Sequence, residues 1–176
     1  MNERLEYQQL ECYKLANDMQ KEKLNREPYF DLGKLPGKQL QTEFAEYIYY
    51  RGTQVSILTI KAERQHFNSL CEFFKKPSHQ KNSLLDREKD IWIKQLKLWM
   101  MQNGRALTKH KVTSIQTESV EKAALIRYFE NLLEFTLDRS ETNELAKDIW
   151  YLERLPLILW TNPIVNHKTL NFRGIR

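Results

Sequence analysis

The chain has 176 residues, enough for one domain or for one domain with an additional arm. Glycine and proline number only five each, which disfavours a turn-rich all-β fold, while apolar residues make up 41% of the chain and suffice for a core. Lysine and arginine exceed aspartate and glutamate by 28 to 23, an excess too small to indicate nucleic-acid binding by itself.

The N-terminal part is predicted to form an arm outside the main domain. Residues 3–24 are good helix formers with apolar residues among charged ones, which indicates a moderately amphipathic helix. Residues 25–38 contain two prolines and two glycines, a composition typical of a linker. We therefore expect an arm over residues 1–37, a main domain over 38–160 and a connector over 161–176.

The main domain is predicted to begin with two helices. The first covers residues 40–50, and Gly52 is expected to stop it. The second covers residues 56–76 and has the most regular pattern, because its apolar residues recur at helical spacing on one face. Ser56 is a candidate N-cap of this helix, and Pro77 is expected to end it.

The rest of the main domain is also predicted to be helical. A third helix begins near residues 84–86 and runs to Gln102, and a fourth covers residues 117–137. The apolar run 149–160 is interrupted by Pro156, which predicts a short helix followed by an extended piece. The expected fold is therefore all-α, an orthogonal bundle of about four or five helices with an extra N-terminal helix.

Charge is unevenly distributed along the chain. Residues 51–81 hold six lysines and arginines against two acids, whereas residues 130–153 hold seven acids against two basic residues. Residues 105–111 and 167–176 are basic and contain no acid. Such polarity can orient a domain against a polyanion, although the alternative is a set of ordinary solvated helix faces.

The sequence offers no catalytic, metal or cofactor motif, so we expect neither enzymatic activity nor a bound cofactor. It has no glycine-rich phosphate loop and no HExxH motif, and its four histidines are dispersed. Cys12 and Cys71 lie far apart among apolar residues and are expected to be reduced. We find no signal-peptide pattern and no stretch apolar enough to cross a membrane, so the expected location is the cytoplasm.

A candidate DNA-binding row lies on the helix predicted over 56–76. Lys61, Gln65 and Asn68 fall in one row, and Arg64 flanks them. Lysine and arginine neutralise phosphates, while glutamine and asparagine can bond base edges, adenine above all, in the major groove. The alternative reading is that these side chains only keep the surface soluble.

Other residues could extend this contact. Ser56 and Thr59, near the start of the same helix, can donate to a phosphate with help from the helix dipole. A second stretch of DNA backbone could be held by the basic loop and by the fourth helix, through Arg105, Lys109, Lys111, Lys122 and Arg127.

Four segments of the sequence resemble one family. They are TQVSILTIKAERQHFNSLCEFF at residues 53–74, LLDREKDIWIKQLKLWMMQNG at 84–104, SVEKAALIRYFENLLEFT at 119–136 and NPIVNHKTLNFRGIR at 162–176. The first three resemble helices of the SAM-like core-binding domain of tyrosine recombinases, the phage-integrase family, in its longer transposon-borne form. The last is similar to the connector that leads from that domain to the rest of the enzyme.

The resemblance implies how such a module holds DNA. In the family, the core-binding domain and the catalytic domain grip a duplex from opposite sides as a C-shaped clamp. By match to the motif, the helices at 56–76 and 117–137 would face the groove. The first contacts expected are Lys61, Arg64, Gln65 and Lys122. The implied partners are double-stranded DNA and either a catalytic recombinase domain or further copies of the chain.

The chain departs from the family in two respects. Glu63 stands where the family commonly has an aromatic residue, so we expect different packing there. No histidine is followed by arginine at the third position, and the catalytic half of the family is not found in this sequence. We therefore expect either the N-terminal part of such an enzyme or the product of a gene that kept only the DNA clamp, in both cases non-catalytic as it stands. The competing hypothesis is a protein-interaction module that oligomerises through the predicted helix 3–24.

Overall fold

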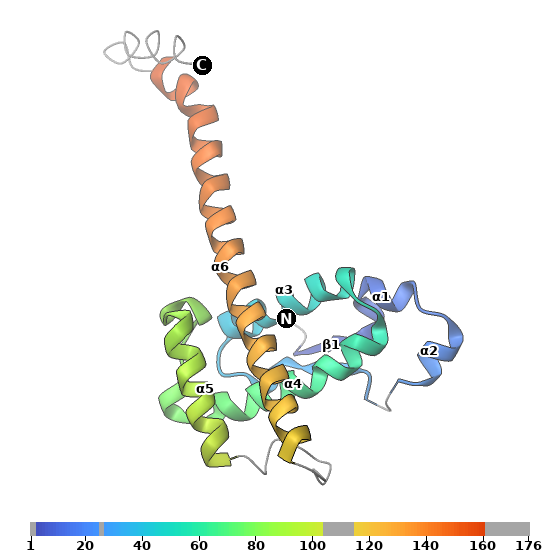
Figure 1. Ribbon diagram of the computed structural model, residues 1–176. Coiled ribbons are helices and arrows are strands. Elements are labelled where there is room, and N and C mark those ends of the chain that lie inside the picture. The colour runs from blue at the N-terminus through green and yellow to red at the C-terminus, as the bar shows by residue number, and fades with distance from the viewer. Residues whose placement is uncertain (1–2, 25–26, 104–114, 161–176) are drawn as a thin grey trace. The chain divides into compact units, whose positions relative to one another are not determined.

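The computed structural model describes residues 3–24, 27–103 and 115–160. The chain forms two compact units, Met1–Thr136 and Leu137–Arg176. The described residues are mostly helical, with one small two-stranded sheet, which confirms the predicted all-α class (Figure 1).

The single N-terminal helix predicted over residues 3–24 is wrong. Strand β1 (Arg4–Glu6) pairs antiparallel with β2 (Tyr29–Asp31), and only two short helices follow β1, α1 (Glu11–Lys14) and α2 (Asp18–Glu22). Burial explains the difference, because Leu5 pairs with Phe30 and both side chains lie in the core. A local preference for helix was overridden by a partner strand distant in the sequence.

The segment predicted as a linker is part of the core. Phe30, Leu32 and Leu35 are each at most 3% exposed. The backbone N–H of Tyr7 donates to the carbonyl of Pro28 at 2.8 Å, which ties the two N-terminal stretches together. The compact unit Met1–Thr136 therefore includes the residues that we expected to form a separate arm.

The first long helix, α3, spans Lys38–Gln54 and continues past the residue expected to stop it. Gly52 lies inside the helix, and a Cβ placed there would meet the Leu10 side chain at 3.2 Å. The glycine thus allows Leu10 to pack closely against α3, and its role is packing and not helix termination.

Helix α4 spans Ile57–Lys75, close to the prediction. The Ser56 side chain accepts a hydrogen bond from the backbone N–H of Thr59 at 3.3 Å, which confirms Ser56 as the N-cap. A 3₁₀ turn, Pro77–His79, follows the helix.

Helix α5 spans Lys89–Asn103 and follows a separate 3₁₀ turn, Leu84–Asp86. The buried Glu43 of α3 fixes this turn, because its carboxylate accepts from the Ser83 hydroxyl and, at 2.8 Å, from the backbone N–H of Leu84. The indole N–H of Trp92 donates to the Leu84 carbonyl at 2.9 Å, so the turn and α5 are joined.

Helix α6 spans Ile115–Trp160, so the predicted end at residue 137 and the predicted break at Pro156 are both wrong. Residues 138–148 contain neither glycine nor proline, and nothing there stops the helix. Residues of α6 up to Thr136 belong to the first unit, and those from Leu137 belong to the second. The connector expected over 161–176 lies outside the described residues.

Aromatic side chains from four helices form the core of the first unit. Phe67 and Phe74 of α4 each contact Phe44 of α3 edge to face, with ring centroids 5.8 and 6.0 Å apart. Phe74 also meets Trp92 of α5 at 5.5 Å and Phe129 of α6 at 6.2 Å. Each such pair contributes about 0.5–1.5 kcal/mol beyond the burial of its area. The inner face of α4 is therefore firmly held, and its opposite face is directed outward.

Candidate nucleic-acid interface

Exposed residues follow a line that winds around α4 from its N-terminal end. Ser56, Thr59, Ala62 and Gln65 are exposed, whereas the apolar residues of the helix point into the core. Because an α-helix turns about 100° per residue, each step of three residues shifts the direction by about 60°, so these positions wind halfway around the helix. Gln65 lies about opposite the buried face, whereas Ser56 and Thr59 are exposed at the end of the helix. The line combines two hydroxyls at the start of the helix with an amide two turns further on.

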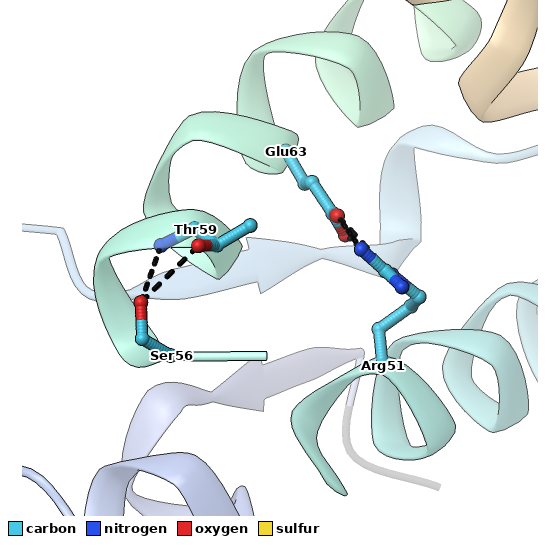
Figure 2. Close-up of polar contacts among 4 residues, drawn as sticks. All are labelled: Arg51, Ser56, Thr59 and Glu63. Atoms are coloured by element: carbon cyan, nitrogen blue, oxygen red, sulfur yellow. Dashed lines mark hydrogen bonds and ion pairs between the residues drawn. The ribbon is translucent and has the colours of Figure 1, made fainter. Parts of the chain in front are cut away.

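The two hydroxyls lie together at the helix start (Figure 2). The Ser56 Oγ is 3.1 Å from the Thr59 Oγ1, and it also accepts from the Thr59 backbone N–H. Helix N-termini carry partial positive charge, and hydroxyls there can donate to an anion. With α4 long enough to have a developed dipole, this end is chemically suited to a phosphate oxygen.

The two cations of the predicted row are engaged with the N-terminal segment. The Lys61 ammonium donates to the carbonyl of Lys23. The Arg64 guanidinium lies 3.5 Å from the Glu27 carboxylate, and only 17% of the Arg64 side chain is exposed. The sequence pattern predicts two cations available to phosphate, but in the structure each of them already has an oxygen partner.

The two amides of the row differ in exposure. Gln65 is exposed, and Asn68 is half-buried. The Ser69 hydroxyl donates at 3.1 Å to the backbone carbonyl of Gln65, and this bond does not involve the Gln65 side-chain amide. Gln65 is thus the better placed of the two amides to reach an external hydrogen-bonding group.

The first part of α6 packs beside α4. The ring of His66 on α4 lies 5.5 Å from the ring of Tyr128 on α6. Lys122 is half-buried and Arg127 is exposed, and five residues of helix rotate their directions about 140° apart. The two cations of α6 therefore lie on different sides of this helix and cannot form a single row.

The remaining candidates cannot be placed. Arg105, Lys109 and Lys111 lie outside the described residues.

A partly buried ion pair that the sequence analysis missed joins α3 to α4 (Figure 2). The Nε of Arg51 donates to both carboxylate oxygens of Glu63, at 3.1 and 3.3 Å, and its Nη2 donates to one of them. The Arg51 and Glu63 side chains are 25% and 14% exposed. The one hint of this contact in the sequence is Glu63 itself, which stands where the family commonly has an aromatic residue. The spacing of residues along α4 does not show which residue of another helix Glu63 contacts.

Ionisable groups gather around this pair. Burial lowers the pKa of His66, against the opposing influence of Glu63 and then Glu121. Burial also raises the pKa values of Tyr47 and Tyr128, so both phenols stay neutral. One carboxylate oxygen of Glu121 is buried without a hydrogen-bond partner among the described residues. The cluster is a polar contact between α4 and α6 in which the imidazole stays neutral near pH 7.

The cysteines offer no reactive site. Both Cys12 and Cys71 are free and buried. Burial raises the pKa of Cys71 to about 12, so it is a thiol and not a thiolate at neutral pH.

Among the described side chains, no group of three or more potential ligands could hold a metal ion. No helix in this part of the chain is both long enough and apolar enough to span a membrane.

Comparison with known proteins adds no relative: no protein-family model, no curated protein and no solved structure matches the chain.

Proposed function

We propose that the chain is a non-catalytic module that binds double-stranded DNA through exposed residues of α4. The observation that supports this most is the exposed line of Ser56, Thr59 and Gln65 on a helix whose inner face is held by an aromatic core. The same segment carries the strongest resemblance to the core-binding domain of tyrosine recombinases, so DNA recombination and integration are the processes that we propose for it.

The chemistry of the line suits a duplex. The hydroxyls at the start of α4 would take a phosphate oxygen, and the Gln65 amide would reach a base edge. Thr59 and Gln65 are six residues apart, which is about 9 Å along a helix axis. The two positions also differ by about 120° in direction around the helix, so the hydroxyls and the amide would reach different parts of the duplex, the backbone and a base edge.

A line this narrow gives limited affinity alone. Lys122, Arg127 and the basic loop 105–111 would supply further phosphate contacts. In the clamp that the resemblance implies, a catalytic recombinase domain or further copies of the chain would hold the other side of the duplex and raise the overall affinity by effective concentration. The proposed location is the cytoplasm, where such DNA is accessible.

The test is binding of a fluorescently labelled duplex at two salt concentrations, measured by anisotropy. The variant Thr59→Glu/Gln65→Glu adds two negative charges to the exposed line. The matched control is Ser78→Asp/Asn82→Asp, which adds the same charge at exposed positions beyond the other end of α4. We expect the first variant to lose at least about 1 kcal/mol of binding free energy relative to the control.

Two results would contradict the proposal. Equal affinities of the two double variants would show that α4 does not face the DNA. A parent protein that binds no duplex even at about 50 mM salt, where phosphate contacts are strongest, would remove DNA binding altogether.

The competing hypothesis of oligomerisation through an N-terminal helix loses its structural premise. The segment 3–24 forms a strand and two short helices, and Leu5, Tyr7 and Leu10 are buried in the core of the same unit. No long apolar helix face is left there for a partner.

A further inference from the structure

The N-terminal segment places a carboxylate and an aromatic ring beside Arg64. The guanidinium lies 3.5 Å from the Glu27 carboxylate, and its Cζ is 5.9 Å from the centre of the Tyr29 ring. Arg4 approaches the same ring at 4.6 Å. The Glu27 side chain is 69% exposed, whereas that of Arg64 is 17% exposed. Glu27 is therefore the partner that an approaching molecule meets first.

The neighbouring cation is satisfied by the same segment. The Lys61 ammonium, one turn before Arg64 on α4, donates to the carbonyl of Lys23. Both positive groups beside the exposed line thus already have an oxygen partner that belongs to the stretch just before β2. A carbonyl leaves the lysine charge in place, but a carboxylate cancels the arginine charge.

We propose that Glu27 acts as a built-in competitor of DNA phosphate at Arg64, so that a duplex binds α4 by exchanging this carboxylate for a phosphate. The inference rests on the DNA-binding function proposed above and adds a means of restraint to it.

Carboxylate and phosphate are interchangeable partners for a guanidinium, because its planar fork of donors matches both. An ion pair with so exposed a carboxylate is weak and is screened by salt, so a phosphate can replace it. Contact with the Tyr29 ring holds the guanidinium in place while the carboxylate leaves. Arg64 is thereby kept positioned but electrically neutralised until a polyanion arrives.

The experiment removes the competitor without changing its shape. The variant Glu27→Gln is compared with Glu22→Gln, which removes the same charge from an exposed position of α2 in the same segment. Each protein is titrated with a labelled duplex between about 50 and 200 mM salt, after circular dichroism has shown that it is folded. The same two substitutions are repeated in an Arg64→Gln background.

We expect Glu27→Gln to bind DNA about two- to fivefold more tightly than Glu22→Gln, the range that corresponds to the loss of one exposed ion pair. This advantage should be largest at the lowest salt concentration, because salt screens the ion pair that only the protein with Glu27 has to break. In the Arg64→Gln background, the difference between the two substitutions should vanish.

The failures are distinguishable. If the parent binds DNA but Glu27→Gln behaves like Glu22→Gln, or if the difference persists without Arg64, the competition is disproved and the DNA-binding function stands. If no protein in the series binds DNA at the lowest salt concentration, the proposed function falls, and the competition falls with it.

Discussion

The ion pair between Arg51 and Glu63 allows a quantitative test of how α3 and α4 are held together. Removing one partner of a fully buried pair costs about 3–5 kcal/mol, and an exposed pair contributes about 0–1 kcal/mol. With side chains 25% and 14% exposed and a two-point contact at Nε, this pair lies between those limits. We expect Glu63→Ala or Arg51→Ala to lower the free energy of unfolding by about 2 kcal/mol.

The double variant separates the interaction from its surroundings. Once one partner is absent, removing the other relieves an uncompensated charge, so Arg51→Ala/Glu63→Ala should lose less than the sum of the single losses. We expect a coupling energy of about 1–2 kcal/mol. The assay is urea and thermal denaturation followed by circular dichroism, in which a single variant should lower Tm by about 4–8 °C.

The matched control is the pair between Glu72 and Lys75, whose side chains are 56% and 58% exposed on the same helix. Glu72→Ala should change stability by less than about 0.5 kcal/mol. A Glu63→Ala variant no less stable than Glu72→Ala would refute the reasoning, because the contact would then behave as an ordinary surface pair.

Three further predictions concern stability and reactivity. Burial lowers the pKa of His66, so this histidine contributes stability that is complete above about pH 6.5 and is lost as the pH falls below it, because the unfolded chain is protonated first. The difference in Tm between pH 7.5 and pH 5 should therefore be smaller in His66→Gln than in the parent, and His79, whose pKa burial also lowers, should account for part of the difference that remains. Gly52→Val should destabilise the protein by about 1–3 kcal/mol in urea titrations, since the larger side chain would press on Leu10, whereas Gly52→Ala should be tolerated far better because alanine regains helix propensity. Cys71, a buried thiol with a pKa of about 12, should react with a thiol reagent only as fast as the protein unfolds, and rapid labelling in the native state would contradict its placement.

The parts of the fold that were predicted correctly are those with a strong local signal. Helix α4 has apolar residues at helical spacing, a serine at its N-cap and a proline beyond its end, so its bounds follow from the sequence. The N-terminal segment has no comparable signal. Its strand forms because Leu5 finds Phe30, a partner that lies beyond two short helices, and no window of sequence reveals such a pairing.

Two errors arose from residues with more than one meaning. The sequence predicts a helix stop at Gly52, but a glycine inside a helix also serves where another chain segment approaches closely, as Leu10 does here. Pro156 predicts a break, but α6 continues through it. A glycine or a proline thus indicates an unusual backbone or packing requirement at its position, but the sequence alone does not show which of these requirements applies.

The candidate site was predictable only in part, for the same reason. The exposure of Gln65 follows from the helical period of α4, and that of Ser56 and Thr59 from their place at its N-terminal end. The electrostatic state of its cations does not, because Lys61 bonds a carbonyl 38 residues earlier and Arg64 pairs with Glu27. Which side chains lie outward is a local property, whereas which charges are already compensated depends on tertiary contacts.

That distinction bears on how a helix of this kind can bind DNA. Affinity for a duplex depends on the number of phosphates neutralised, and α4 presents an exposed line of uncharged polar side chains flanked by cations that are already engaged. Polar side chains that contact a groove discriminate between sequences more than they add affinity. Such side chains suit a module whose affinity for DNA comes from phosphate contacts made by other parts of the complex. A weak contact with base edges then adds sequence specificity to that complex. If the proposed function is correct, binding by the isolated chain should therefore be weak, and it should tighten when a second DNA-binding module is linked to it.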